Sequence, residues 1–149
     1  MSGRDYCYRP ILVVNVGKIL ELKPKEKLFL ETLGYFFTFI IENCLIEGQI
    51  ENWVSIIDLG NASVFSLGGT LVDTITFLSS NFRARVHCSY LINAPSSIKF
   101  VWGMVKGALT EDQLKKLSLS SKKELGEGDF EEINKSQVER KYGGKKSNI

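Results

Sequence analysis

Several residue types that would mark a specialised protein are scarce in this chain. It has one histidine and three cysteines, and Cys7, Cys44 and Cys88 are widely spaced among its 149 residues. A secreted disulfide framework needs an even and denser set of cysteines, so we expect reduced thiols in a cytoplasmic protein. No cysteine or histidine has the spacing of zinc ligands, and His87 and Cys88, as neighbours in a strand, are expected to face opposite sides of a sheet. We therefore expect no metal and no cofactor, and a structural role for His87.

Long apolar runs and an excess of one charge are also missing. The most apolar stretch, residues 33–41, is cut by Glu42 and is well short of the roughly 20 residues that span a membrane. The N-terminus has no apolar segment of the signal-peptide type. Nineteen lysines and arginines against 17 aspartates and glutamates leave a net charge of +2, which does not indicate a nucleic-acid partner. These observations predict a soluble protein, which can still work transiently on membrane surfaces.

What remains is the composition of an ordinary globular protein, with 44% hydrophobic and 24% charged residues. The length suits a single domain over residues 1–149. Residues 49–97 contain only five charged side chains, whereas residues 122–146 are dense in both signs. The middle of the chain is therefore expected to be core, and residues 120–149 to form a solvated wrap over it.

Short apolar runs alternate with helical patterns along the chain. Residues 11–16, 53–58 and 87–92 are rich in β-branched or aromatic residues and predict buried strands. Elsewhere apolar residues recur every three or four positions, or a cap precedes them, which predicts helices. The expected helices are residues 25–47, which stop at Gly48, residues 70–82, a helix after Ser96 or Ser97, and a short helix after a capping box of Thr110 and Gln113. This order predicts an α/β sandwich with some parallel strands.

Catalytic motifs are weak throughout the chain. Ser79, Ser80 and Ser89 lack the Gly-x-Ser-x-Gly elbow of common hydrolases. The segment Asp58–Asn61 is interpreted as a turn in preference to a metal or substrate site. Leu67–Thr70 is interpreted as a Gly-Gly turn in preference to a phosphate-binding loop, because it lacks the Gly-Lys-Ser/Thr ending. We therefore expect the protein not to be an enzyme.

Two of the expected helices carry more large apolar residues than one core-facing stripe requires. These residues are Tyr35, Phe36, Phe37 and Phe39 in the first helix, and Phe100, Trp102, Met104 and Val105 in the third. Dense core is the simpler interpretation of this pattern. A large apolar cavity lined by these helices is the alternative.

The second half of the chain carries an ordered set of motifs. They are Tyr90-Leu91-Ile92-Asn93-Ala94-Pro95, then Phe100, Trp102, Lys106 and Leu109, then Lys115-Lys116-Leu117, and finally Tyr142-Gly143-Gly144. Upstream, the set includes Arg9-Pro10-Ile11, Asp58-Leu59-Gly60 and Asn81-Phe82-Arg83-Ala84-Arg85. In order and spacing these motifs resemble the CRAL-TRIO lipid-binding domain, the family of the Sec-fourteen-type phosphatidylinositol transfer proteins, over about residues 4–144.

The resemblance implies a CRAL-TRIO-type sandwich, in which a mixed, mainly parallel sheet is the floor of a hydrophobic lipid pocket closed by a helical gate. The gate falls on residues 100–109 and the turn that continues to Lys116. The pocket and gate residues that it implies are Phe77, Tyr90, Phe100, Trp102, Val105 and Leu109. The implied ligand is a phospholipid, with phosphatidylinositol favoured, or another hydrophobic molecule.

The resemblance also implies head-group residues. The lysine that meets the inositol phosphate falls on Lys116, a polar neighbour falls on Gln113, and a hydroxyl for a choline phosphate falls on Ser55. Leu12 and Val14 stand where the choline site has a tyrosine and an acidic residue. Phosphatidylinositol is therefore favoured over choline lipids.

The leading functional hypothesis is non-enzymatic binding of phosphatidylinositol or a similar lipid, with its transfer or presentation at a membrane surface. The family's N-terminal helical lobe is not expected, because the chain begins at the first strand. Apolar surface left without that lobe is expected to permit a homodimer. The alternative hypothesis is a protein-interaction or membrane-targeting scaffold that keeps the fold and has lost lipid transfer.

Overall fold

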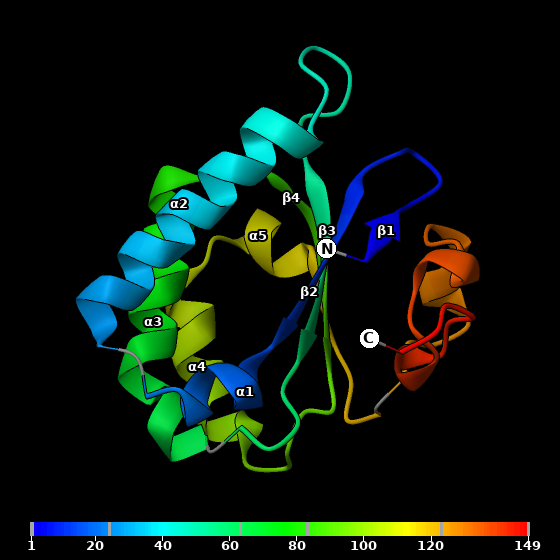
Figure 1. Cartoon of the computed structure of the whole chain (residues 1–149). Helices are drawn as coiled ribbons and strands as arrows, with labels where there is room; N and C mark the ends of the chain where they lie inside the picture. Colours follow the sequence, from blue (N-terminus) through cyan, green and yellow to red (C-terminus); the bar gives the residue numbers. More distant parts are fainter. Residues whose placement is uncertain (1, 24, 63, 83, 123, 149) are drawn as a thin grey trace.

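The computed structural model has a five-stranded sheet at its centre. It describes residues 2–23, 25–62, 64–82, 84–122 and 124–148, without the side chains of residues 64–72, 100 and 101. The strands β1 to β5 lie in chain order and are Gly3–Arg4, Pro10–Asn15, Trp53–Asp58, Val86–Ile92 and Leu117–Leu119. β1 is antiparallel to β2, and the other neighbouring strands are parallel (Figure 1). The predicted α/β class and mainly parallel sheet are confirmed.

The three strands that the sequence predicts form the middle of this sheet. β3 has the expected bounds, and β4 begins one residue early at Val86. β2 ends at Asn15 because the Asn15 side chain accepts a 2.9 Å hydrogen bond from the Lys18 amide and caps a short helix, α1 (Val16–Glu21). The sequence does not predict β1, β5 or α1, because such short elements carry too little periodicity.

Four further helices follow the predicted order: α2 (Glu26–Cys44), α3 (Val64–Asn81), α4 (Ile98–Ala108) and α5 (Glu111–Lys115). The capping box of α5 is confirmed, since the Thr110 amide donates to Gln113 Oε1 at 2.9 Å and the Gln113 amide donates to Thr110 Oγ1 at 3.3 Å. None of the helices in the described ranges is long and apolar enough to cross a membrane.

Two predicted helix boundaries are wrong. α2 ends at Cys44, and Gly48 lies in the following turn, where its φ of 70° suits glycine. α3 begins at Val64, so Gly68 and Gly69 lie within a helix and do not form a turn. The helix-propensity cost of glycine, about 1 kcal/mol, is small enough for the rest of the fold to override.

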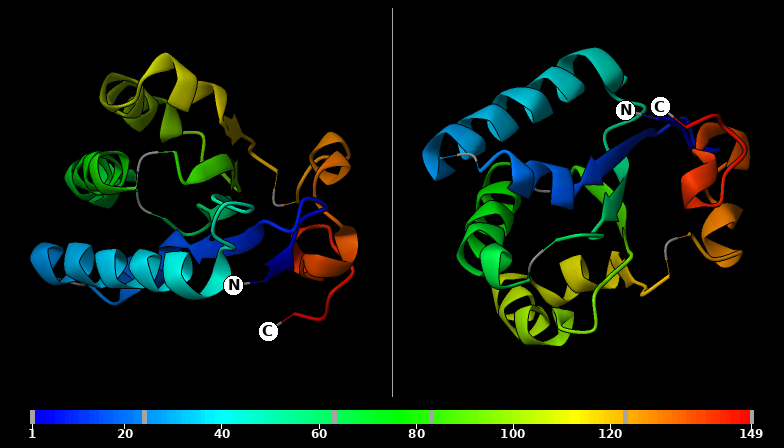
Figure 2. Two further views of the ribbon diagram at one scale, coloured as in Figure 1. Left: turned by 90° about the horizontal axis from the view of Figure 1, so that it is seen from above. Right: turned by 60° about the horizontal axis from the view of Figure 1, so that its bottom comes forward.

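The sheet separates two unlike layers (Figure 2). Helices α2, α3 and α4 cover one side, the helix face, and the C-terminal segment with three short 3-10 helices covers the other, the wrap face. The wrap is more than a solvated cover, because four of its apolar residues are buried on the sheet. This wrap-face core contains Leu125, Ile133, Val138 and Tyr142 together with Ile11, Val54, Ile56, Tyr90 and Ile92.

The helix face is packed differently. Among the described residues its buried side chains form three separate clusters. Under α2, the Phe37 ring stacks on Trp53 with ring centroids 5.0 Å apart. At the carboxyl ends of the strands, Leu59 packs with Ile98 from α4. Val105 anchors the third cluster, between α4 and β5. A continuous core therefore lies on the wrap face, and a divided one on the helix face.

Candidate functional site

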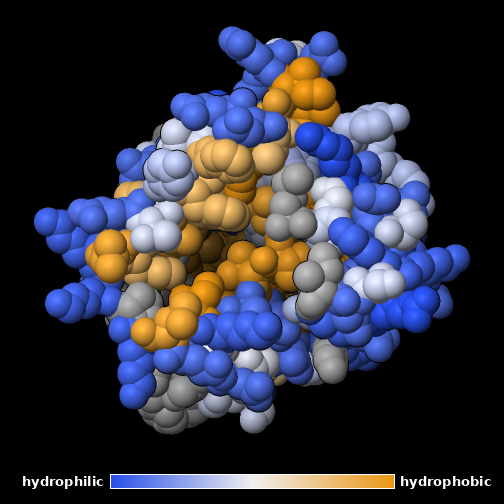
Figure 3. Space-filling model, viewed as in Figure 1, coloured by the Kyte–Doolittle hydropathy of each residue, from blue (hydrophilic) through white to orange (hydrophobic). Residues whose placement is uncertain are grey.

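An apolar hollow opens beside the helix face of the sheet (Figure 3). In this view it lies between α2 and α1, with α3 and α4 behind it (Figures 1 and 2). Large apolar side chains are exposed on two of these helices, including Tyr35 at 78% and Phe39 at 50% on α2 and Met104 at 54% on α4. The surplus of aromatic residues in the sequence is thus only partly buried: Phe37 packs in the core, while Tyr35 and Phe39 stay exposed.

Two serine side chains lie in the sheet on the side of this hollow. Ser55 alternates with Trp53, which packs under α2, so its side chain is on the helix face. Ser89 in β4 is the register partner of Ser55. Both residues are buried, at 7% and 5% exposure. Their hydroxyls are the polar groups that this part of the sheet can offer to a bound molecule.

Three of the predicted gate residues are brought together. Trp102 and Val105 from α4 and Leu109 from the following turn pack with Ile75 of α3 and Leu117 of β5. Helix α4 therefore rests on α3 at one side and on the sheet edge at the other. Phe100 lies in α4, but its side chain is outside the described residues.

Phe77 occupies a different position from the gate residues. It lies on α3 with its ring 6.1 Å from that of Phe82, and a Cβ at Gly34 would come within 3.3 Å of it. Phe77 thus packs between α3 and α2. Its ring therefore lies on the side of α3 that faces α2, and the Val105 cluster lies on the side that faces α4.

Tyr90 does not join the predicted pocket wall. It is buried in the wrap-face core, next to Ile56 in the register of the sheet. Burial raises the pKa of Tyr90, and the hydrogen bond between its hydroxyl and the Cys88 thiol raises this pKa further. The sequence alone does not reveal this placement, because alternation puts Tyr90 opposite Ser89 without saying which face the helices cover.

The predicted head-group residues lie at the β5 edge. Lys116 Nζ donates a 3.0 Å hydrogen bond to the Val86 carbonyl, and no described carboxylate pairs with it. The Ser89 amide donates to the Lys116 carbonyl at 2.8 Å, which places the Lys116 backbone beside Ser89, with β4 between it and Ser55. The Gln113 side-chain oxygen accepts the capping-box hydrogen bond from the Thr110 amide. This oxygen therefore stabilises the start of α5 and is already paired when a ligand arrives.

The turn at Asp58 is structural, as expected. Gly60 donates its amide to Asp58 Oδ1 at 2.9 Å. Asn93 donates to the same oxygen at 3.2 Å, and Asn15 and the Tyr142 hydroxyl approach Oδ2 at 3.3 and 3.4 Å. Burial, and then the charge of Asp58, raise the pKa of Tyr142 to about 12. The carboxyl ends of three parallel strands and the wrap are thus joined at one carboxylate.

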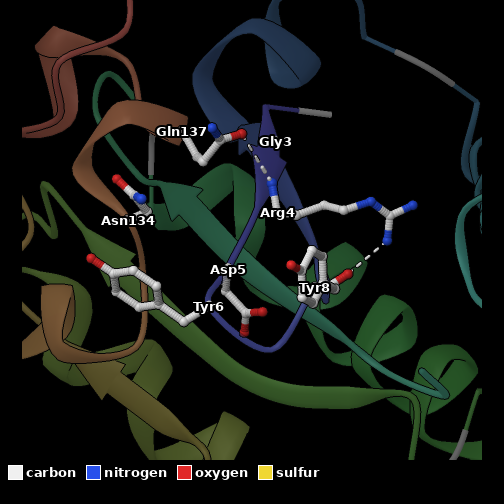
Figure 4. Close-up of a pocket in the computed structure, with 7 residues that line it drawn as sticks. All are labelled: Gly3, Arg4, Asp5, Tyr6, Tyr8, Asn134 and Gln137. Atoms are coloured by element: carbon white, nitrogen blue, oxygen red, sulfur yellow. Dashed lines mark hydrogen bonds between the residues drawn. The ribbon is translucent and has the colours of Figure 1, made fainter. Parts of the chain in front are cut away.

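A second cavity, of about 470 Å³, lies between the β1–β2 hairpin and the wrap (Figure 4). It is lined by Gly3, Arg4, Asp5, Tyr6, Tyr8, Asn134 and Gln137. The Arg4 guanidinium is held by the carbonyls of Tyr8 and Cys44 at 2.6 and 2.9 Å. We assign no ligand to this cavity.

The expected opposite orientation of His87 and Cys88 is wrong. Trp53 pairs with Val86 and Val54 pairs with Cys88, so a bulge leaves His87 as an extra residue in β4. A bulge interrupts the alternation of side chains, and both residues turn toward the wrap face. Their nitrogen and sulphur atoms and a carboxylate oxygen of Glu132 all lie within 4.8 Å of one another.

Comparison with known proteins agrees with this architecture. The CRAL/TRIO domain model matches residues 1–144. The chain belongs to the CRAL/TRIO domain family. A solved structure titled "Crystal structure of Sfh5" superposes with a TM-score of 0.73 at 16% identity, over 97% of this chain and 54% of that one. This CRAL/TRIO domain therefore spans about half the length of that neighbour, and the likeness shows its fold. No curated protein sequence matches the chain.

Proposed function

We propose that this CRAL/TRIO domain binds one lipid molecule in the hollow beside the helix face and carries or presents it without chemical change. Membership of the family supports lipid binding in general. The observation that carries the proposal is the apolar hollow beside the helix face, on the side of the sheet where the Ser55 and Ser89 side chains lie. Apolar walls suit acyl chains, and hydroxyls at the floor suit the ester or phosphate oxygens of the same lipid.

The driving force for such binding is removal of acyl chains from water. Each buried methylene contributes about 0.8 kcal/mol, so a carrier without an apolar enclosure could not hold a two-chain lipid outside a bilayer. The exposed aromatic side chains of α2 add apolar surface that can face a membrane during loading. We propose that the protein works at a membrane surface that it reaches from the cytoplasm.

Phosphatidylinositol is the lipid that we propose. Lys116 supports this choice, because its ammonium group has a carbonyl neighbour and no described carboxylate, which leaves its charge available to a phosphate. Lys115 provides the contrast, since its ammonium is exposed and pairs with Asp112 at 3.0 Å. Of these two adjacent lysines, only Lys116 therefore has an ammonium group without a described carboxylate partner.

The first experiment is native mass spectrometry after incubation with vesicles that contain phosphatidylinositol, phosphatidylcholine and phosphatidylserine in equal parts. One bound phosphatidylinositol per protein is the expected result. A stoichiometric lipid of another class would keep lipid binding and reject the head-group assignment. A folded protein that stays empty with every lipid would reject lipid carriage.

Lys116→Ala should weaken phosphatidylinositol binding by roughly 10- to 100-fold, because a charge-assisted hydrogen bond contributes about 1.5–3 kcal/mol. The matched control is Lys115→Ala, which should load like the wild type. Loading is measured by the same mass spectra, and circular dichroism checks that both variants fold. Equal loading of the two variants would remove Lys116 from the head-group site.

The second candidate function is a protein-interaction module, which the α2 surface favours. Tyr35, Phe36 and Phe39 are exposed on one helix at 78%, 42% and 50%. Contiguous exposed aromatic residues are typical of interfaces. An empty protein that forms homodimers in native mass spectra would favour this function over lipid carriage.

A further inference from the structure

Three side chains with different ligand atoms meet at the start of β4. His87 Nε2 lies 3.1 Å from Glu132 Oε2, and the Cys88 sulphur lies within 4.8 Å of both groups. His87 and Cys88 share a side of the sheet because of the bulge, and Glu132 reaches them from the wrap. The cluster therefore exists only where two parts of the chain, 45 residues apart, come together.

The surroundings of the cluster leave room for a solvent ligand. The side chains of His87 and Glu132 are 34% and 49% exposed, while Cys88 is half-buried. Arg9 approaches Glu132 at 3.5 Å, but its closer partner is the fully buried Asp5 carboxylate. A cation at the cluster would thus compete with a weak contact of Glu132 and would not have to break the Arg9–Asp5 pair.

We propose that His87, Cys88 and Glu132 form a binding site for a divalent cation of the zinc type. Imidazole nitrogen, thiolate sulphur and carboxylate oxygen are ligands that Zn²⁺ accepts together, with water as the fourth. Neighbouring ligands of a tetrahedral zinc ion are roughly 3.3–3.8 Å apart, given its bond lengths. The His87–Glu132 pair already has nearly this spacing, and rotation of the half-exposed Glu132 side chain brings the carboxylate and the thiol closer.

The bound cation links the sheet to the wrap. Cys88 loses its proton to solvent when its sulphur binds the metal, and the Tyr90 hydroxyl remains beside that sulphur as a hydrogen-bond donor. Because the ligands come from β4 and from the wrap, a cation that binds only the folded chain stabilises their association. This inference is independent of the lipid function and survives its failure.

The test is titration of the chelator-treated full chain, kept reduced with a phosphine, with Co²⁺ as a spectroscopic probe and then with Zn²⁺. One Co²⁺ per chain should bind, with the visible absorption of tetrahedral coordination and a thiolate charge-transfer band in the near ultraviolet. Zn²⁺ should displace it and raise the melting temperature. Cys88→Ser and His87→Gln should each weaken binding by tenfold or more, an order-of-magnitude loss for a ligand.

The chain supplies matched controls. Cys7→Ser and Cys44→Ser remove the other two free thiols and should bind like the wild type. Glu132→Gln alters a half-exposed side chain, so it should weaken binding while the metal-free melting temperature stays near that of the wild type. Cobalt spectra without a thiolate band, or equal affinity of the Cys88 and Cys7 variants, would overturn the proposal and show adventitious metal binding only.

Discussion

Asp58 is buried at the carboxyl end of β3, and four donors converge on its carboxylate. Asn15 and Asn93 come from the ends of the flanking strands, and Tyr142 comes from the wrap. Buried polar groups are stable only when they are paired, so each donor depends on this one acceptor. At the residue scale, Asp58 thus links the carboxyl ends of β2, β3 and β4 and the wrap in one hydrogen-bond network.

Asp58→Ala should lower the free energy of unfolding by about 1–3 kcal/mol, because it leaves several buried donors without an acceptor. Urea denaturation followed by circular dichroism measures this change. Asp112→Ala serves as the control, since its side chain is 88% exposed and only pairs with Lys115 at the surface, where a loss within about 0.5 kcal/mol is expected. Similar losses in the two variants would mean that the Asp58 network contributes little.

At the element scale, α4 is the helix on which the family resemblance places the gate of the proposed lipid pocket. Among its described side chains, Ile98 and Val105 are buried and Met104 is 54% exposed. Gly103 and Gly107 face open space, and a Cβ at either position would contact nothing within 4 Å. Two glycines lower the intrinsic stability of a helix and so favour its local opening. These features suit a helix that uncovers a pocket.

Replacement of both glycines by alanine should stabilise α4 by roughly 1 kcal/mol per position, because alanine has the higher helix propensity. Amide hydrogen exchange in residues 98–108 should slow accordingly. If opening of α4 limits lipid exchange, transfer between vesicles should slow as well, while the amount of lipid bound at equilibrium does not fall. Slower amide exchange with unchanged transfer would show that lipid leaves by another route.

Over the whole molecule, the two faces of the sheet differ in how their side chains pack. The wrap face holds a continuous core, including Ile133 and Val138, which are fully buried. The helix face is divided into clusters around a hollow. An apolar hollow costs packing contacts, so the stability of the fold must come mainly from elsewhere. The wrap supplies that stability and leaves the helix face available to a ligand.

Ile133→Ala should therefore destabilise the protein by about 2–5 kcal/mol, as expected for a large core side chain. Leu22→Ala is the matched control, because Leu22 is 79% exposed and should change the free energy of unfolding by less than about 0.5 kcal/mol. Both values come from denaturation of the lipid-free protein. A loss near zero for Ile133→Ala would show that the wrap is not part of the cooperative core.

Much of the fold could be predicted because its signals are local. β3 and the core of β2 and β4 are apolar on both sides, which marks them as covered strands. Thr110 and Gln113 lie three positions apart and form their capping box without help from the rest of the chain. The ordered motifs from Arg9 to Gly144 also identified the family, which the match over residues 1–144 confirms.

The α/β class, the central strands, α5 and the family could be predicted, because each depends on the spacing of nearby residues. Which face each side chain occupies needed the folded chain: Tyr90 packs against the wrap, Ser55 lies beside Ser89, and His87 contacts Glu132. The bulge in β4 and the seating of the wrap set these contacts. Both depend on the packing of segments far apart in the chain, which no local period encodes.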